Sequence, residues 1–345
     1  MARIQIQIVG WNHKRYLTRL FESLRTQSFK DFSVIYIDNA STDGSLNLVR
    51  EKFPEVTVLK NNNNLGFTGA HNQGFQLALS KWPVSELDNR FVLVLNPDIV
   101  ATPTFLEELV RAAEKNPRAA SFGGKLMKMF ATEGLDRELE QVDSSEILDS
   151  TGITKFKTGR FADRGAGETD TNQYQEGEVW GISGAALFVR AGAAEAIRHD
   201  EFVFDPDFFA YKEDVDLAWR FQRAGYSAFY APKAIAYHYR GAYGKEKASF
   251  FETLKNRRKK SPFVSFLSYR NHLLLLVKNL GFGEFFATSY RLVPYEFGKF
   301  LAMLILEPVT LAKSLWSFLC LAPKMIGKRR LLKSLSRISP QPNNE

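Results

Sequence analysis

Three sets of polar residues follow short apolar stretches in the first hundred residues of this chain: Gly10-Trp11-Asn12, Asp38-Asn39 and Asn96-Pro97-Asp98. A carboxylate such as Asp38 at the end of a buried strand could accept the ring N–H of a pyrimidine base. Asp98 could hold a divalent cation that bridges two phosphates, because Mg²⁺ binds one or two carboxylates together with substrate oxygens. Each also has a plainer interpretation, since Asp38 could cap the following helix and Asn96-Pro97-Asp98 could be a turn.

The surrounding sequence predicts elements that would bring these residues to one edge of a sheet. Residues 4–9 and 32–37 are β-branched runs that flank residues 16–26, where leucine and phenylalanine recur at helical spacing. That pattern predicts a βαβ unit with parallel strands and a right-handed crossover. Further strands are predicted at 56–59 and 91–95, and helices after STDGS and around 72–79. The alternation predicts a doubly wound α/β sheet, in which ligands bind outside the carboxyl ends of the strands.

The second part of the chain is less regular. Residues 120–178 scatter Gly, Thr, Asp and Glu among short apolar runs, which predicts hairpins and a mobile loop. Ordered elements are then expected again: a small-residue strand over 179–189, a helix over 194–198, an acidic loop that leads into the helix of YKEDVDLAWRFQRAG, and a strand that ends in AIAYHY.

Five segments, in this order, resemble the successive signatures of family 2 inverting glycosyltransferases with the GT-A fold. The segments are IVGWN, IDNASTDGS, NNNNLGFTGAHNQG, LVLNPDI and FFAYKEDVDLAWRFQRAGY, and together they span about residues 3–240. The match is to the branch that includes rhamnosyltransferase-like enzymes of cell-surface polysaccharide assembly. The resemblance implies a Rossmann-like, mostly parallel GT-A catalytic domain over residues 1–250 that binds a nucleotide sugar.

The resemblance also implies roles for individual residues. Asp38 would recognise the nucleobase, and a glycine such as Gly66 would allow the backbone to approach the donor closely. Asp98 matches the metal-binding acid of the family's D-x-D motif, and Asn96 replaces the first acid of that motif. The residues expected to bind the donor are Val9, Trp11, Asn12, Asp38, Asn39, Asn64, Gly66, Phe67, Asn72, Asn96, Ser183 and Gly184.

Glu213 and Asp214 open the helix of KEDVDLAWR, and Asp214 matches the family's catalytic base. Inversion needs one base that takes the proton of the acceptor hydroxyl as it attacks the anomeric carbon. The alternative is that these acids only complement the helix dipole, the role assigned here to Asp216.

Three further assignments keep two interpretations each. His238 would complete a Mg²⁺ or Mn²⁺ site with Asp98, or it is structural. Ser183 and Gly184 would leave room for the donor sugar, or they serve tight packing. Candidates for the acceptor cleft are Trp180, Trp219 and Arg220, of which Trp219 also fits a core position.

The C-terminal part, residues 251–345, is basic and apolar at once. It holds 16 Lys and Arg against 5 Asp and Glu, beginning with FETLKNRRKK, whereas residues 1–250 have a small acidic excess. Its longest uncharged interval, residues 314–323, is shorter than the roughly 20 residues of a membrane span. We therefore expect helices that lie in the interface of an anionic membrane; the alternative is a basic helical subdomain packed on the core.

These observations predict a metal-dependent, inverting glycosyltransferase. It would move a sugar, with rhamnose as the family-based choice, from a dTDP- or UDP-linked donor to a glycan or polyprenyl-linked acceptor at the cytoplasmic face of the membrane. A nucleotidyltransferase would need an early Gly-rich basic loop, and a nucleic-acid partner is disfavoured because the cleft half is acidic. An inactive membrane scaffold is the remaining alternative. The single cysteine, Cys320, cannot form an internal disulfide.

Overall fold

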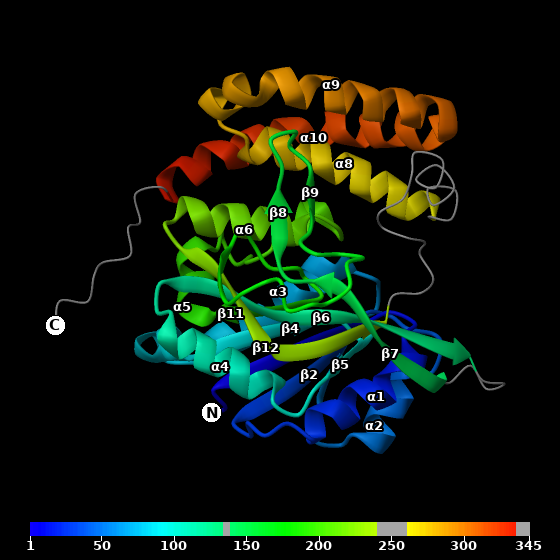
Figure 1. The fold of residues 1–345 in the computed structure, drawn as a ribbon, viewed down its shortest axis with the longest axis vertical. Coiled ribbons are helices and arrows are strands. Elements are labelled where there is room, and N and C mark those ends of the chain that lie inside the picture. The colour runs from blue at the N-terminus through cyan, green and yellow to red at the C-terminus, as the bar shows by residue number, and fades with distance from the viewer. Residues whose placement is uncertain (134–138, 240–260, 336–345) are drawn as a thin grey trace.

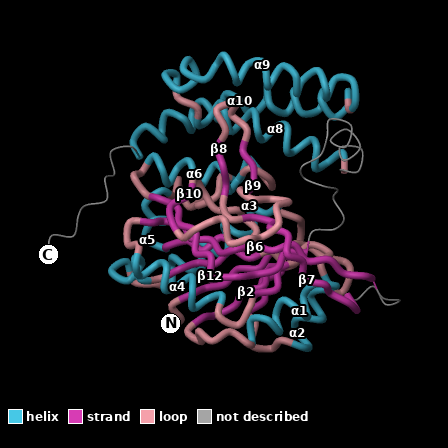
Figure 2. Tube along the Cα trace, in the orientation of Figure 1, coloured by secondary structure: helices cyan, strands magenta, loops and turns pink. Residues whose placement is uncertain are grey.

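The computed structural model describes residues 1–133, 139–239 and 261–335. A curved sheet with helices on both faces forms the lower half of the molecule in Figure 1, and three long C-terminal helices lie across the top. Figure 2 separates the two parts by colour, with the strands gathered below and only helices in the uppermost layer. Ten strands belong to the main sheet, and two more, β8 and β9, form a separate hairpin.

The first hundred residues form the parallel half of the sheet, with strand order β4-β1-β2-β3. Its elements are β1 (Ile4–Gly10), α1 (Lys14–Arg25), β2 (Phe32–Asp38), α2 (Ser45–Lys52), β3 (Thr57–Lys60), α3 (Gly66–Lys81), the 3-10 turn η1 (Val84–Asn89) and β4 (Phe91–Leu95). The predicted alternation is confirmed. Helix α3 begins six residues before the predicted start, because the Asn-rich loop ends at Gly66.

The register of these strands decides where the polar residues fall. Gly10 pairs with Asp38 across β1 and β2, and Ile8 pairs with Leu95 across β1 and β4. Since all three strands are parallel, their carboxyl ends meet at one edge of the sheet. We call this edge the rim; it carries the residues that follow Gly10, Leu95 and the end of β2.

The second half of the sheet is mixed, with β11 antiparallel between the parallel strands β4 and β6. Its elements are β5 (Ile99–Ala101), α4 (Phe105–Lys115), β6 (Ala119–Glu133), β7 (Leu139–Ser150), β8 (Ile153–Lys155), β9 (Phe161–Asp163), β10 (Gly177–Val179), β11 (Ala186–Arg190), α5 (Ala191–Ile197), η2 (Pro206–Phe208), α6 (Glu213–Arg223) and β12 (Ser227–Tyr239). The prediction of hairpins in 120–178 is confirmed by β6–β7 and β8–β9.

The strand predicted over 179–189 is wrong in its extent. β10 ends at Val179 and β11 starts at Ala186, and residues 184–185 form a turn between them. Glycines at 181 and 184 weaken strand pairing here. The turn brings the backbone N–H of Gly184 to the side chain of Asp214, a contact that a continuous strand would not provide.

Two apolar clusters fill the two faces of the sheet. Ile4, Ile6 and Ile8 of β1 point to the cluster beneath α1, α2 and α4, whereas Val92 and Val94 of β4 point to the cluster beneath α3, α5 and α6. This alternation follows from the two-residue period of a strand. The sheet is thus buried on both faces, and its rim is the edge that remains open to ligands.

The C-terminal helices are α8 (Pro262–Asn279), α9 (Phe282–Leu306) and α10 (Pro308–Leu335). Leu275 of α8 and Leu280, which directly follows α8, pack with Phe208 and Trp219 in one apolar cluster, so α8 shares a core with the segment around α6. The predicted boundary at residue 250 and the basic run 251–260 lie outside the described residues. The division into two domains therefore stays a prediction.

Within the part of the chain that the structure describes, one helical stretch, Pro308–Arg330, is long and apolar enough to cross a bilayer. The criterion rests on length and composition alone. Within that stretch Lys324 and Lys328 form ion pairs with Asp207, and Lys328 also pairs with Asp205. These pairs bind α10 to the loop before α6.

Candidate functional site

Asp38 lies fully buried at the rim, at the end of β2. One carboxylate oxygen, Oδ2, accepts a hydrogen bond from the backbone N–H of Ser41 at 3.3 Å. The other, Oδ1, has no hydrogen-bond partner among the described residues. A buried carboxylate oxygen without a partner is rare in folded proteins, because its desolvation is not compensated. A ligand N–H at this position would supply the missing partner, and the base-recognition role of Asp38 stays a prediction.

The Asn-rich loop is held in shape by Asn39. Its Nδ2 donates to Asn64 Oδ1 at 2.9 Å and to the carbonyl of Gly66 at 3.1 Å, and its Oδ1 accepts from the backbone N–H of Leu65 at 3.0 Å. Gly66 has a φ of +72°, and a Cβ there would lie 2.5 Å from the carbonyl oxygen of Phe209. Asn39 and Asn64 therefore shape the rim loop, and their direct contact with a donor stays a prediction.

The β1–α1 turn is joined to the β2–α2 turn by Asn12. Asn12 has a φ of 58°, in the left-handed region that asparagine tolerates. Its Oδ1 accepts from the backbone N–H of Thr42 at 2.8 Å. Beside it, Trp11 is exposed, whereas Val9 is half-buried against Ile35 and Ile37. An exposed indole at the rim is suited to stacking on a flat base or sugar.

Asn72 does not occupy the place predicted for it. It is buried, its Nδ2 donates to the carbonyl of Phe204 at 2.8 Å, and its Oδ1 accepts from the backbone N–H groups of Val203 and Phe204 at 3.1 and 2.9 Å. The amide thus positions the segment before η2 instead of a ribose or diphosphate. Phe67, by contrast, lies at the rim, with its ring 3.5 Å from where a Cβ of Gly184 would be.

Asp98 and His238 are brought together although they are 140 positions apart. The backbone N–H of Tyr239 donates to the carbonyl of Asp98 at 2.9 Å, and His238 pairs with Ile99 across β12 and β5. As a result His238 Nε2 lies 3.3 Å from Asp98 Oδ1. Burial alone would raise the pKa of Asp98, but the neighbouring His238 outweighs it and holds that pKa below its usual range.

His238 has a second carboxylate partner, Asp149. Its Nδ1–H donates to Asp149 Oδ2 at 2.8 Å, and both side chains are buried. Burial opposes the charged imidazolium, but Asp98 and Asp149 together raise the pKa of His238 to about 9. The hydrogen bond to Asp149 fixes the ring so that Nε2 points toward Asp98. Carboxylates that accept the other ring N–H of a metal-binding histidine orient the ring in the same way.

The donor set of Asp98 and His238 fits a divalent cation. Two ligands on neighbouring corners of an octahedron with bonds of about 2.1 Å are about 3 Å apart, close to the 3.3 Å between Asp98 Oδ1 and His238 Nε2. Asp98 Oδ1 is buried and pairs with the His238 imidazolium, so His238 Nε2 would have to lose its proton to bind a cation. No group of three or more metal-binding side chains exists among the described residues. An ion here would therefore need oxygens of the substrate, as a diphosphate provides.

The turn at 183–185 links this pair to Asp214. On one side the backbone N–H of Asn96 donates to the carbonyl of Ala185 at 2.9 Å, so Asn96-Pro97-Asp98 is both a turn and part of the rim. On the other side the N–H of Gly184 donates to Asp214 Oδ2 at 3.0 Å. The pair predicted to bind a metal and the acid predicted to be the base thus flank the same short segment.

Asp214 lies at the N-terminus of α6, in a well-defined position. Its Oδ1 accepts from the backbone N–H of Val215 at 2.8 Å, and the preceding residues Tyr211 and Lys212 have positive φ angles that turn the chain sharply into the helix. Burial raises the pKa of Asp214 above its ordinary value, even though the N–H of Gly184 opposes the shift. A raised pKa makes a carboxylate a better proton acceptor.

Glu213 differs from Asp214 in its surroundings. It is buried, and its Oε2 has no hydrogen-bond partner among the residues that the structure describes. Burial, and next the charge of Asp214, raise the pKa of Glu213 to about 8. Glu213 is therefore mostly protonated at neutral pH, which leaves Asp214 as the better candidate for the base.

Two other predictions for α6 are wrong. Asp216 does not cap the helix, because it is fully buried and bonds to Arg220 Nε at 3.0 Å and to Lys278 Nζ at 2.8 Å. Arg220 is likewise buried and cannot line an acceptor cleft. Trp219 is a core residue that packs against Phe161, with ring centroids 5.5 Å apart, as the alternative interpretation held.

The sequence interpretation missed two residues near the site. Asp149 lies in EILDS, within the segment that the prediction treated as irregular, and no local pattern connects it to His238. His13 directly follows the predicted Gly10-Trp11-Asn12 set, and it is close enough to Asp98 for the two charges to interact. The sequence could have indicated His13 as a site residue only through its position directly after Asn12, a predicted rim residue.

Comparisons with known proteins agree with this geometry. Residues 6–158 match the model of glycosyl transferase family 2, and residues 148–324 match that of glycosyl transferase family group 2. An N-acetylglucosaminyl-diphospho-decaprenol L-rhamnosyltransferase from Mycobacterium tuberculosis is 30% identical over 256 residues, which cover 71% of this chain and 79% of that protein. The chain belongs to glycosyl transferase family 2. Rhamnosyltransferase WbbL from Escherichia coli K12 is 25% identical over 240 residues, 68% of this chain and 83% of that protein.

Solved structures show that this family 2 chain has a GT-A-like fold. GalNAc-T7, solved with UDP, GalNAc and Mn²⁺, superposes with a TM-score of 0.58 at 12% identity, over 81% of this chain and 48% of GalNAc-T7, so the chain spans about half of that protein. S. aureus TarS 1–349 in complex with UDP-GlcNAc gives a TM-score of 0.52 at 14% identity, over 97% of this chain and 88% of the TarS 1–349 fragment. Membership of the family favours a glycosyltransferase over the nucleotidyltransferase and scaffold alternatives.

Proposed function

We propose that this family 2 glycosyltransferase is a metal-dependent, inverting rhamnosyltransferase. It would move rhamnose from a dTDP- or UDP-linked donor to a hydroxyl of a polyprenyl-linked glycan. The observation that carries the proposal is the 183–185 turn, which is bonded to Asn96 on the side of Asp98 and His238 and to Asp214 on the other. The named rhamnosyltransferase relatives support the choice of sugar, and the decaprenol-linked substrate in one of their names supports the choice of acceptor.

The chemistry follows from the positions of the acids. Asp214 takes the proton of the acceptor hydroxyl while its oxygen bonds to the anomeric carbon, and the bond from that carbon to the diphosphate breaks with its electron pair on the phosphate oxygen. One displacement inverts the configuration, so no protein nucleophile is required. Asp98 and His238 would hold Mg²⁺ or Mn²⁺, which neutralises the departing diphosphate. Asp38 would hold the base of the nucleotide through its unpaired oxygen.

The proposal is tested by incubating the protein with dTDP-rhamnose, Mn²⁺ and a synthetic N-acetylglucosaminyl-diphospho-lipid. We expect a product that is heavier by one rhamnose, with an anomeric configuration opposite to that of the donor in its proton NMR spectrum. UDP-sugars serve as parallel donors, and excess chelator serves as the metal control. A product with retained configuration, or undiminished transfer in chelator, would refute the mechanism.

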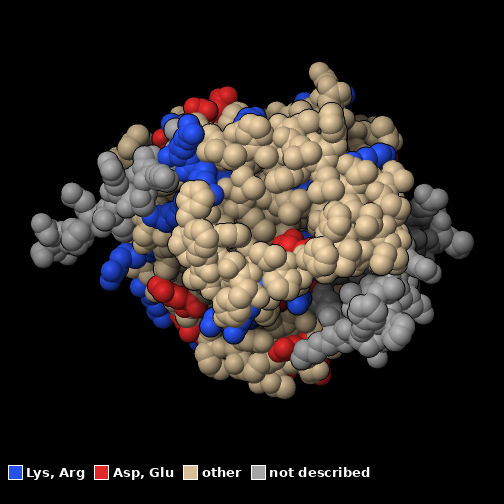
Figure 3. Space-filling model, turned by 90° about the horizontal axis from the view of Figure 1, so that it is seen from above, with Lys and Arg blue, Asp and Glu red and all other residues tan. Residues whose placement is uncertain are grey.

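We further propose that the C-terminal helices contact an anionic membrane surface on the cytoplasmic side. α9 exposes a continuous apolar stripe along one face, in which Phe286 is 72% exposed and Phe297 is 61% exposed. The stripe comprises Phe282, Phe286, Tyr290, Val293, Phe297, Leu301, Leu304 and Ile305. In Figure 3 the face above α9 is mostly uncharged, with Lys and Arg mainly at its margins. Apolar burial with a cationic border favours interfacial binding.

Point substitutions test membrane contact better than deletion of residues 251–345, because the deletion would also remove the core residues Leu275 and Leu280. We expect the double variant Phe286→Glu/Phe297→Glu to lose flotation with vesicles of phosphatidylglycerol and phosphatidylcholine. Val84→Glu, which changes an exposed apolar residue of η1, is the matched control and should float like the wild type. Equal flotation of all three proteins would refute the interfacial face.

A further inference from the structure

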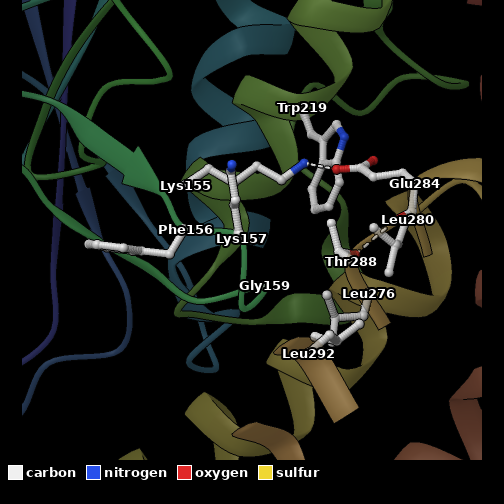
Figure 4. Close-up of a pocket in the computed structure, with 10 residues that line it drawn as sticks. All are labelled: Lys155, Phe156, Lys157, Gly159, Trp219, Leu276, Leu280, Glu284, Thr288 and Leu292. Carbon is white, nitrogen blue, oxygen red and sulfur yellow. Dashed lines mark hydrogen bonds and ion pairs between the residues drawn. The ribbon is translucent and has the colours of Figure 1, made fainter. Parts of the chain in front are cut away.

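A pocket of about 160 Å³ lies between the β8–β9 hairpin and helices α8 and α9. Its apolar lining includes Trp219, Leu276, Leu280 and Leu292, and the hairpin adds Lys155, Phe156 and Lys157. Figure 4 shows Lys155 reaching from the hairpin to Glu284 of α9, beside Trp219. An apolar pocket of similar size, about 150 Å³, holds one benzene-sized molecule. This pocket therefore has room for a hydrocarbon group of about five carbons.

The pocket is connected to the proposed base by two elements. Trp219 follows Asp214 by five residues on α6, which is about 7.5 Å along the helix axis. The hairpin also extends from the proposed base to the pocket. Asp163, at the end of β9, is near enough to Asp214 for their charges to interact. Phe161, near the other end of β9, pairs with Lys155, which lines the pocket. Five residues also turn the helix by about 140°, so a substrate must pass around α6 and span more than one sugar residue, as a sugar followed by a diphosphate does.

The charges at the pocket favour an anion beside the hydrocarbon. Lys155 Nζ lies 4.0 Å from the centre of a Trp219 ring and forms an ion pair with Glu284. Lys157 is exposed at the tip of the hairpin. Two ammonium groups against one carboxylate leave a net positive charge. A phosphate near Lys157 would compete with Glu284 for Lys155, and the apolar surroundings would strengthen the attraction.

The pocket also adjoins the proposed membrane face. Leu292 of α9 is buried and lines the pocket, whereas Phe286 and Tyr290 of the same helix are exposed in the apolar stripe. A hydrocarbon chain that leaves the pocket would therefore meet the helix that we propose lies on the lipid surface. A water-soluble acceptor has no hydrocarbon chain that could use this contact with α9.

We infer that this pocket binds the first isoprene unit of an acceptor in which a sugar is linked to a polyprenyl diphosphate, with the phosphate next to the lipid beside Lys155 and Lys157. The inference rests on the proposed function, because it names the part of the acceptor that lies beyond the sugar. In this arrangement the acceptor hydroxyl faces Asp214, and the lipid runs along the hairpin toward α9.

The test measures binding of farnesyl phosphate to the full-length protein by isothermal titration calorimetry. Thr288 lines the pocket, so Thr288→Phe would fill it, whereas Ala287→Phe adds the same ring at an exposed neighbouring position of α9. We expect Thr288→Phe to weaken binding at least about tenfold, which corresponds to the loss of one buried hydrocarbon unit. Ala287→Phe should bind like the wild type. Equal binding by all three proteins would place the ligand on the exposed stripe and overturn the inference.

A second variant covers the case in which Thr288→Phe does not fold, as judged by circular dichroism. Lys157→Glu changes an exposed residue, so it should fold normally. We expect it to weaken farnesyl phosphate binding several-fold and to leave farnesol binding unchanged. Unchanged binding of farnesyl phosphate, or binding of inorganic phosphate by the wild type as tight as that of farnesyl phosphate, would contradict the assignment.

The transfer assay separates this inference from the proposed function. Protein that binds farnesyl phosphate at the pocket but transfers no sugar to any acceptor would support the pocket and refute the transferase. Protein that transfers rhamnose, but whose Thr288→Phe variant keeps the wild-type KM for a prenyl-linked acceptor, would support the transferase and refute the pocket.

Discussion

The rim of the sheet and the C-terminal helical layer are built in different ways. At the rim, Gly10, Asp38 and Leu95 reach one edge because neighbouring parallel strands share one register. The helical layer is instead joined to α6 by buried charges: Lys278 Nζ lies 2.7 Å from Asp205 and 2.8 Å from Asp216. Local sequence patterns thus place Asp38 at the rim, whereas contacts between distant segments place the helical layer against α6.

The largest expected effect is that of Asp214→Asn, which tests the rim. The amide cannot accept the proton of the acceptor hydroxyl, although its oxygen can still accept the N–H of Gly184. We expect transfer to fall at least about 10³-fold. Binding of dTDP with Mn²⁺, measured by calorimetry, should change less than about threefold. Turnover near the wild-type rate would show that another group is the base.

Lys278→Met tests the junction between the helical layer and α6. The substitution leaves Asp205 and Asp216 buried next to Arg220 and Lys328 without their shared ammonium group. We expect urea unfolding to show a loss of about 3–5 kcal/mol, because removing one partner leaves buried charge uncompensated. The matched control is Lys324→Met, whose side chain is 56% exposed and pairs with Asp207. It should cost less than about 1 kcal/mol. Similar losses in both variants would contradict the buried junction.

These two regions also show how far sequence patterns carry a prediction. Asp38 and Asp98 directly follow buried strands, so the strand pattern was sufficient to place them at the rim. Asp149 was missed because its partner His238 is 89 positions away and the pair forms only when β6 joins β7 and β12. The pairing of Asp216 with Lys278 depends in the same way on α8, which lies outside the family resemblance of residues 3–240.

The prediction for Asn72 failed for a related reason. Its place in NNNNLGFTGAHNQG suggested a donor contact, but the residue faces the segment 203–204, whose path no local pattern specifies. The turn at 183–185 was hidden for a similar reason. The run of small apolar residues from 179 to 189 fits a strand by composition, and it is interrupted where the backbone N–H of Gly184 meets Asp214.

Asp149→Asn tests a part of the rim that depends on long-range contacts. The amide N–H₂ can face His238 Nδ1, which would keep the proton of the neutral ring on Nε2, so Nε2 would have no lone pair to offer a metal ion. We expect Mn²⁺ affinity, measured by electron paramagnetic resonance in the presence of dTDP, to fall about 10–100-fold. Asp170→Asn removes a carboxylate that pairs with Lys125 instead, and it should leave Mn²⁺ affinity unchanged. Equal affinities would assign Asp149 a purely structural role.

The smallest expected effect concerns Glu213 and pH. Its pKa is about 8 in the folded protein against an ordinary value of 4.5, so the folded state holds a proton that the unfolded state has released between these values. The stability that this proton contributes is complete below pH 4.5 and is lost as the pH rises through 8. Glu213→Gln does not titrate. Thermal melts should therefore show that the variant gains about 1 kcal/mol of stability relative to the wild type from pH 7 to pH 8. A constant difference would disprove the shift.

The central claim is that one nucleoside diphosphate lies between the Asp98–His238 pair and Asp214. The most direct measurement is a crystal structure with dTDP and Mn²⁺, in which anomalous scattering locates the metal. We expect Mn²⁺ bound by Asp98 Oδ1, His238 Nε2 and diphosphate oxygens, with the thymine ring at Asp38. Manganese bound elsewhere, or a diphosphate far from the 183–185 turn, would contradict the account.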